Sequence, residues 1–296
     1  SMRILLTGGS GFLGNYISKA MSSHSIDTFG RSEKSTIRLD LAKAFKLDNS
    51  YDMVIHCAGL AHIIPKSEEE VESFKRINSE GTINLLNAFQ KPPKVFVFIS
   101  SVAVYGLDTG ESIDENVSLC GQTPYAKSKI EAERVISKWC KEENVELLIL
   151  RLPLICGLNP PGNLHSMMKA IKRGLYVRIG VGSARKSMVS AEDVAKLIAS
   201  PNLTSGIYNL TDGIHPTIKD TDSHISKLFG KSVRSLPTSL ISTIAKVGDV
   251  VPFFPLNSLR FNKLNSSLTF SDKRAREHLN WNPEPALNSL SFVDEK

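Results

Sequence analysis

The sequence predicts an α/β fold, in which a doubly wound parallel sheet is followed by a smaller C-terminal lobe of mixed α and β structure. Residues 3–7 form an apolar run that leads directly into a glycine-rich turn and a helical pattern. Further apolar runs of strand length alternate with segments of helical spacing, and the links between them are short. Short links between alternating strands and helices favour crossover connections within one parallel sheet.

The composition narrows the class of protein. With 296 residues, of which 41% are hydrophobic and 22% charged, the chain can form a full globular core. Its apolar runs are too short for a signal peptide or a membrane-spanning helix, so no membrane partner is expected. The net charge of +6 is dispersed, which suits an anionic small ligand and argues against nucleic acid as a partner. The four cysteines show no paired spacing, which indicates reduced thiols, a cytoplasmic protein and no metal site. They are Cys57, Cys120, Cys140 and Cys156.

The first strand ends in a glycine turn that has the spacing of a dinucleotide-binding fingerprint. Gly8 and Gly11 allow a tight turn and the close approach of a pyrophosphate, and Gly14 lets the next helix pack closely on the strand. The N-terminus of that helix offers free N–H groups and a positive dipole end to the phosphates. The residues predicted to hold this part of a cofactor are Gly8, Gly11, Phe12, Leu13 and Gly14.

The second strand, predicted over 25–29, ends at Gly30-Arg31-Ser32. An NAD site usually has an acidic residue near this strand end, which binds the ribose 2′-hydroxyl. Arg31 instead offers a planar cation to a 2′-phosphate, so NADP(H) is favoured and NAD(H) stays possible. In the alternative interpretation Arg31 is an ordinary surface residue and Asp27 serves an NAD ribose.

Two more strands are predicted over 36–39 and 53–57. Asp40-Leu41 follows the first of them, and Asp40 is expected to accept a hydrogen bond from the adenine amino group, to cap a helix over 41–47, or both. Small residues close the second strand, where a cofactor can lie against the backbone. We therefore add to the predicted cofactor site Asp40, Leu41, Cys57, Ala58 and Gly59.

A long helix over 67–90 and a strand over 95–99 lead to the candidate catalytic residues. Ser101 follows the strand, and after a polar stretch Tyr125 and Lys129 open a helix, four residues apart and therefore on one face. A nearby ammonium lowers the pKa of a phenol, and a serine hydroxyl can bind the same substrate oxygen. Such a trio can move a proton on or off a carbinol while hydride passes to or from a nicotinamide.

With these residues in place, the chain resembles the extended short-chain dehydrogenases/reductases, and in particular the nucleotide-sugar epimerase/dehydratase/reductase family with its UDP-glucose 4-epimerase-like members. The resemblance implies a Rossmann fold. It also implies that Asn78, in Asn78-x-x-Gly81-Thr82, is structural and relays protons near the cofactor, and that Lys129 binds the nicotinamide ribose. Tyr125 and Ser101 match the catalytic positions of the family.

Two departures from the family bear on the reaction. Val102-Ala103 stands where 4,6-dehydratases of the family have Asp-Glu, which argues against dehydration. Gly30-Arg31 departs from the pattern of NAD-retaining 4-epimerases. The resemblance therefore implies a 4-keto-sugar reductase or C4 dehydrogenase for a UDP- or dTDP-linked sugar in cell-surface polysaccharide synthesis, such as O-antigen. The alternatives are a UDP-sugar 4-epimerase and a non-catalytic NAD(P)-sensing protein on the same fold.

The C-terminal half supplies the expected substrate contacts. After a strand over 145–150, Asn163-Leu164 near the start of a helix resembles a diphosphate-contacting pair of the family, although Asn163 is equally expected as a helix N-cap. An arginine near position 185 grips the diphosphate in the family, and a guanidinium fork suits two phosphates. The substrate-binding residues that the resemblance implies are Val102, Asn163, Leu164, Arg185 and Arg260.

Two domains are expected. Residues 1–152, with segments that return from the C-terminal half, form the cofactor-binding domain, and residues 153–296 form the nucleotide-sugar-binding lobe. Helices predicted over 218–229 and 236–251 have apolar stripes that belong to the core or to a dimer face. The expected partners are the nucleotide sugar and a second copy of the chain.

Overall fold

A computed structural model describes residues 1–59, 67–251 and 258–294, with backbone only for residues 258–261. Its main feature is a sheet of seven strands that pair in parallel throughout. In spatial order the strands are β11 (Gly206–Asn209), β7 (Glu146–Leu152), β5 (Val95–Ser101), β4 (Met53–His56), β1 (Arg3–Thr7), β2 (Ser25–Gly30) and β3 (Ile37–Arg38). The order reverses at β1, as in doubly wound dinucleotide-binding sheets, and the predicted fold class is confirmed.

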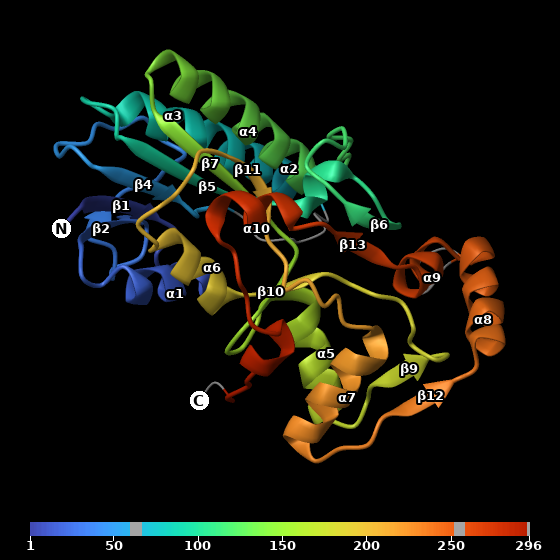
Figure 1. The fold of residues 1–296 in the computed structure, drawn as a ribbon. Helices are drawn as coiled ribbons and strands as arrows, with labels where there is room; N and C mark the ends of the chain where they lie inside the picture. Colours follow the sequence, from blue (N-terminus) through green and yellow to red (C-terminus); the bar gives the residue numbers. More distant parts are fainter. Residues whose placement is uncertain (60–66, 252–257, 295–296) are drawn as a thin grey trace.

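Both faces of the sheet are buried, which explains why its strands are near-continuous apolar runs. In β1, Ile4 and Leu6 face one core cluster while Leu5 faces the other. Helices α1 (Phe12–Ala20), α6 (Ala191–Ile198) and α10 (Lys273–Leu279) contribute to the first cluster, and α3 (Gly81–Ala88) and α4 (Pro124–Glu142) contribute to the second. The result is a three-layer arrangement, seen in Figure 1 with α4 and α3 above the sheet and α1 and α6 below it.

The helix predicted over 67–90 has three parts: α2 (Glu68–Phe74), a π-helical segment (Lys75–Glu80) and α3. It begins where predicted, because the Ser67 hydroxyl accepts the N–H of Glu70 at 3.2 Å as an N-cap. The predicted helix over 41–47 is wrong, since these residues form a turn and irregular structure. Asp40 Oδ1 accepts the N–H of Ala42, two residues on, and this local bond stabilises a turn instead of a helix N-terminus.

The C-terminal half contains a smaller core of its own, built around Met168, Ile171 and Ile225. The helices of this half that do not pack on the main sheet are α5 (Gly162–Lys172), α7 (Ile218–Phe229), α8 (Thr238–Val250) and α9 (Ser258–Asn265). Four short strands form two parallel pairs, which are β8 (Leu154–Cys156) with β10 (Met188–Ser190) and β9 (Val177–Ile179) with β12 (Arg234–Leu236). In Figure 1 these elements lie below and to the right of the main sheet.

A third parallel pair joins the two halves of the chain, and the sequence analysis did not predict it. Strand β6 (Gly110–Ile113), within the polar stretch after β5, pairs with β13 (Leu268–Phe270). The ring of Phe270 stacks on Tyr105 with 5.6 Å between centroids. Tyr105 ends the 3-10 helix Val102–Tyr105 that follows Ser101. The C-terminal half therefore braces the segment that carries Ser101.

Within the described residues no helix is long and apolar enough to cross a bilayer. In the same residues no cluster of His, Cys, Asp and Glu side chains suits a metal ion. The thiols are free and belong to Cys57, Cys120, Cys140 and Cys156.

Candidate active site

The glycine turn after β1 is packed so closely on neighbouring backbone that it has no space for side chains. Gly8 has a φ of 71°, and a Cβ there would come within 2.9 Å of the backbone at Cys57 and Ala58. A Cβ at Gly14 would overlap the carbonyl oxygen of Gly8. Helix α1 begins after Gly11, and no side chain caps its N-terminus. The turn and the uncapped helix end therefore fit a dinucleotide pyrophosphate.

A buried hydrogen-bond network, which the sequence analysis missed, fixes the floor of this turn. Thr7 Oγ1 accepts the N–H groups of Cys57 and Ala58, both at 3.1 Å, so its own proton goes to His56 Nδ1 at 2.6 Å. His56 Nε2 then carries a proton and donates it to Thr82 Oγ1 at 2.9 Å. Burial and the charge of Lys129 lower the pKa of His56 to about 3, so the ring is neutral.

Asn78 and Gly59 meet at the carboxyl end of β4. Asn78 lies in the π-helical segment, a feature that is common at functional sites, and its side chain is buried. Its Nδ2 donates to Ser128 Oγ at 3.0 Å, and Ser128 Oγ donates to the carbonyl of Tyr125 at 2.7 Å. A Cβ on Gly59 would lie 2.8 Å from Asn78 Oδ1 and 3.3 Å from Lys129 Nζ. Only a glycine lets the backbone pass this close to both groups.

Tyr125 and Ser101 come together although they are 24 positions apart in the printed sequence. Their side chains are hydrogen-bonded, and this bond lowers the pKa of Tyr125, but burial has the larger effect and the pKa is raised overall. The predicted lowering of the Tyr125 pKa by Lys129 is therefore wrong. Ser101 Oγ also accepts the N–H of Ala103 at 3.1 Å, which holds the side chain at the end of β5.

Lys129 is a buried cation on the same face of α4. Its Nζ lies 5.9 Å from the centre of the Tyr125 ring, 5.0 Å from that of Phe98, and donates to the carbonyl of Ile99 at 3.2 Å. Burial lowers the pKa of Lys129 to about 8, and the negative charge of Glu133 opposes this shift. The ammonium is thus held at the carboxyl end of β5, beside the phenol, where ligands of parallel sheets bind.

A second buried network lies behind these residues. Glu133, one turn after Lys129 on α4, accepts two hydrogen bonds from Arg151 and one from Ser100. Arg151 Nη1 donates to Tyr105 OH at 3.2 Å, and Tyr105 donates to Asn209 Oδ1 at 2.6 Å. Side chains from five elements therefore share one buried polar cluster, which includes Ser100, the neighbour of Ser101.

The residues predicted to recognise the adenosine half of the cofactor lie on the other side of β1. Arg31 is exposed at the end of β2, and its carbonyl accepts a bond from Arg38 Nε at 3.3 Å. Asp27 is engaged elsewhere, because Tyr51 donates to its Oδ2 at 2.7 Å. Leu41 is buried, and its carbonyl accepts from Asn84 Nδ2 at 2.7 Å, which ties the Asp40-Leu41 turn to α3.

The predicted substrate residues are more scattered. Val102 directly follows Ser101 and is half-buried. Asn163 is exposed in the first turn of α5, whose N-cap is Pro161, so the alternative that Asn163 caps this helix is wrong. Leu164 points into the C-terminal core. Arg185 is exposed, and its Nη1 donates to the carbonyl of His215 at 3.0 Å. The side chain of Arg260 lies outside the described residues.

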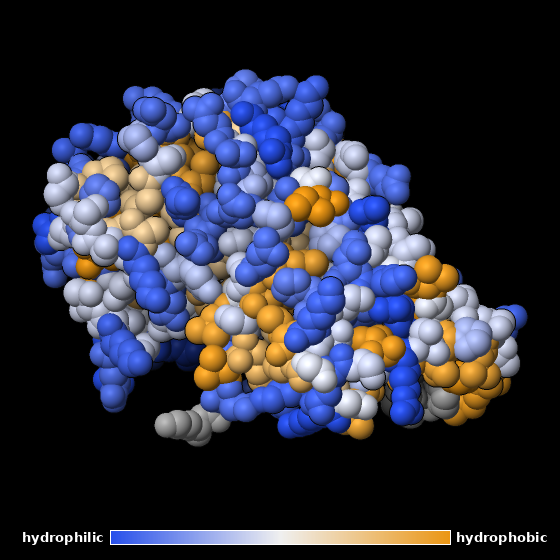
Figure 2. All heavy atoms as spheres, turned by 60° about the horizontal axis from the view of Figure 1, so that its bottom comes forward, coloured by the Kyte–Doolittle hydropathy of each residue, from blue (hydrophilic) through white to orange (hydrophobic). Residues whose placement is uncertain are grey.

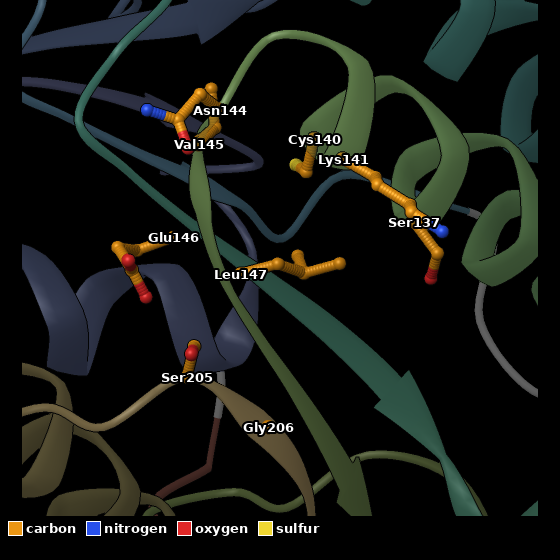
Figure 3. A pocket seen from close by; sticks show the side chains of 9 residues that line it. All are labelled: Ser137, Cys140, Lys141, Asn144, Val145, Glu146, Leu147, Ser205 and Gly206. Carbon is orange, nitrogen blue, oxygen red and sulfur yellow. The ribbon is translucent and has the colours of Figure 1, made fainter.

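A shallow pocket of about 430 Å³ lies elsewhere on the molecule, between α4, β7 and β11 (Figure 3). Its lining includes Asn144 and Glu146 at the amino end of β7 and Ser205 just before β11. Ligands of parallel sheets bind at the carboxyl ends of the strands, where Ser101 lies, so this pocket is separate from the candidate site.

The chain belongs to the NAD dependent epimerase/dehydratase family, whose model matches residues 4–202. It is 24% identical over 310 residues to UDP-glucose 4-epimerase of Vibrio cholerae, with 96% of this chain and 92% of the relative covered. It is 26% identical over 247 residues to N-acetyl-alpha-D-glucosaminyl-diphospho-ditrans,octacis-undecaprenol 4-epimerase of Escherichia coli O157:H7, covering 79% of this chain and 74% of the relative. The resemblance stated from the sequence motifs is confirmed at the level of this family.

Solved structures agree with the fold. UDP-glucose 4-epimerase of Thermotoga maritima with UDP-glucose superposes with a TM-score of 0.74 at 18% identity, covering 97% of this chain and 96% of that one. RMD of Pseudomonas aeruginosa complexed with NADPH gives 0.71 at 21% identity, covering 97% and 98%. At these identities the likeness concerns the fold alone.

Proposed function

We propose that this protein is an NAD(P)-dependent enzyme acting at C4 of a nucleotide-activated sugar, with 4-epimerisation as its leading reaction. One observation carries the proposal: the Ser101 and Tyr125 side chains are hydrogen-bonded beside the buried ammonium of Lys129, at the end of the sheet that also holds the glycine turn. The sequence alone favours a reductase. The curated relatives named as 4-epimerases support the opposite order of preference.

Each residue of the trio has a role in proton transfer. When bound, the nicotinamide cofactor supplies the hydride chemistry. As the phenolate, Tyr125 takes the proton from the C4 hydroxyl during oxidation, and as the phenol it returns that proton during reduction. Ser101 holds the same oxygen through its hydroxyl, and the Lys129 ammonium stabilises the phenolate that forms. Because burial raises the pKa of Tyr125, the neutral phenol is the resting form, and it must lose its proton before it can act as the base in the oxidation step.

We assign the cofactor to the carboxyl edge of the sheet. The uncapped N-terminus of α1 would hold its pyrophosphate, and Asp40 and Leu41 would hold its adenine. Asn78 and Lys129 line the nicotinamide end. The complete proposed set is Gly8, Gly11, Phe12, Leu13, Gly14, Arg31, Asp40, Leu41, Cys57, Ala58, Gly59, Asn78, Tyr125 and Lys129.

A reductase is the second candidate, and Arg31 is the observation that favours it. The guanidinium is exposed at the end of β2, while Asp27 is bonded to Tyr51 and so does not serve a ribose. An arginine at this strand end favours NADPH, which a reductase exchanges after each turnover. One structural neighbour is a complex with NADPH, whereas another is a complex with NAD.

We propose a UDP- or dTDP-linked sugar as substrate and cell-surface polysaccharide synthesis as its use. Arg185 is the diphosphate candidate, because its guanidinium is exposed and only one of its N–H donors has a described partner, the His215 carbonyl. Val102, Asn163, Leu164 and Arg260 complete the candidate set. Leu164 can contribute only through its backbone, since its side chain is in the core.

The reaction is tested by supplying UDP-glucose or UDP-N-acetylglucosamine without added reductant. The C4 epimer of either sugar, separated by anion-exchange chromatography, supports the epimerase, and Tyr125→Phe should form it far more slowly. Stoichiometric loss of NADPH absorbance with a UDP-4-keto-sugar supports the reductase instead. If neither substrate reacts while NAD(P) binds, the third alternative holds and the protein is a cofactor-sensing binding protein.

Three further predictions from the sequence stay proposals. We propose that residues 1–152 with returning C-terminal segments bind the cofactor and that residues 153–296 bind the nucleotide sugar. We also propose that the protein is a cytoplasmic homodimer. Light scattering of the purified chain reports its mass in solution and tests the dimer directly.

A further inference from the structure

Helix α8 exposes a continuous apolar stripe at one end of the molecule. Leu240, Ile244 and Val247 recur at helical spacing on one face, and Val250 and the C-cap residue Val251 continue the stripe at the end of the helix. Between 37% and 82% of each of these side chains is exposed. Figure 2 shows hydrophobic side chains gathered at the right-hand end, where α8 lies in Figure 1.

A different face of α8 attaches it to the protein. Ile241 and Ala245 are buried and pack with Ile179 of β9. These positions are about 100° around the helix from the exposed stripe. The stripe is therefore not the packing face of α8 within the described residues. Packing among the described residues does not account for its apolar character.

The surroundings of the stripe are basic. Residues 230–268 contain five cations, Lys231, Arg234, Lys246, Arg260 and Lys263, and a single acid, Asp249. This stretch thus contributes +4 to a total charge of +6 for the chain. The side chains of Lys231, Arg234 and Lys246 are exposed, and Lys263 forms an exposed ion pair with Asp108 at 3.3 Å.

We propose that α8 docks on an anionic phospholipid bilayer, with its stripe in the interface and the flanking cations on the headgroups. An amphipathic helix with apolar and basic surfaces binds membranes in this way, and anionic lipids attract each nearby Lys or Arg. A second copy of the chain fits less well, because facing stripes would bring two positive segments together. The sequence continues the apolar character after the stripe with Val250-Val251-Pro252-Phe253-Phe254.

An interfacial helix is different from a membrane span, so the proposal agrees with the absence of a spanning helix among the described residues. It does revise the expectation that the protein has no membrane partner, which depended on the lack of a spanning segment. The proposal is independent of the reaction assigned to Tyr125. A cytoplasmic enzyme held in this way would work at the inner surface of the membrane.

Vesicle flotation tests the proposal. The wild-type chain is mixed with vesicles of equal parts phosphatidylglycerol and phosphatidylcholine, or with phosphatidylcholine alone. The double variant Ile244→Ser/Val247→Ser removes apolar area from the stripe. The matched control Val71→Ser/Ile83→Ser changes two exposed aliphatic residues on α2 and α3, far from α8 in the fold.

We expect the wild type and the control to float with the anionic vesicles, with less binding at high salt, because charge attraction is screened. The stripe variant should partition at least about tenfold more weakly. The proposal is overturned if the wild type ignores anionic vesicles, or if the stripe variant binds as the wild type does. It is equally overturned if the stripe instead drives self-association that the variant abolishes. Circular dichroism checks that each variant folds, and slower hydrogen exchange in α8 of the wild type on adding vesicles provides a readout without substitution.

Discussion

Glu133 and Arg151 form a buried ion pair that joins β7 to α4, the helix that carries Tyr125 and Lys129. Arg151 Nη2 lies 2.6 Å from Glu133 Oε1, and Nε lies 3.1 Å from Oε2. Both side chains are at most 5% exposed. The same carboxylate accepts the Ser100 hydroxyl and opposes the lowering of the Lys129 pKa. One carboxylate thus connects the helix of Tyr125 with the strand end that carries Ser101.

Glu133→Gln should lower the free energy of unfolding by about 3 kcal/mol or more, because the guanidinium of Arg151 stays buried without its counter-charge. Urea unfolding followed by fluorescence measures the change. The matched control is Glu131→Gln on the same helix. Glu131 pairs with Arg134 at 2.5 Å, but both side chains are exposed, so its loss should cost less than about 1 kcal/mol. Similar costs for the two variants would contradict the difference in burial.

Tyr125→Phe should lower turnover on the order of 10²- to 10⁴-fold, because the variant keeps the ring but cannot transfer a proton. Cofactor affinity, measured by quenching of protein fluorescence, should change little, since the phenol oxygen is removed without altering the glycine turn. The measurement is the initial rate of C4 epimer formation. If the rate persisted, another group would have to transfer the proton, and the assignment of Tyr125 would be wrong.

His56 should make the protein sensitive to acid. Its folded-state pKa of about 3 lies below the ordinary value of 6.5, so between these values the unfolded chain binds more protons than the folded one. Stability is therefore fully present above pH 6.5 and falls, by up to about 1.4 kcal/mol per pH unit, as the pH drops toward 3.

The acid sensitivity is isolated by comparing His56→Gln with His278→Gln, a change at an exposed histidine of α10. Urea midpoints between pH 4 and 7 should show a shallower pH dependence for His56→Gln alone, whatever its stability at neutral pH. Parallel curves for the two variants and the wild type would show that the neutral His56 ring is not a source of the acid response.

Arg31→Ala should weaken NADPH binding at least about tenfold and leave NADH binding unchanged, because a charge-assisted contact to the 2′-phosphate is lost. Lys34→Ala, at an exposed cation of the same loop, is the control and should alter neither. Calorimetric titration with both cofactors measures the ratio. An unchanged ratio in Arg31→Ala would favour the alternative interpretation of Arg31 as an ordinary surface residue.

Local pattern predicted most of the main sheet, because its strands are buried on both faces and therefore apolar along their length. It failed where a side chain competes with the backbone for hydrogen bonds. Asp40 makes a turn with Ala42 where a helix was predicted, and Asn163 does not cap α5, which begins after Pro161. The residue type determines which hydrogen bonds are possible at such a position, but the surrounding residues determine which of them forms.

The sequence by itself determined which residues can carry the chemistry. The spacing of Gly8, Gly11 and Gly14 and the four-residue step from Tyr125 to Lys129 are local geometry, which a strand, turn and helix impose. Only the tertiary structure decided how these groups are tuned. It buried Tyr125, so that its pKa is raised although an ammonium is near, and it paired Glu133 with Arg151 from another element. The free energy of the charged form of a side chain depends on how far water is excluded from it. Water is excluded only when segments distant in the sequence pack together.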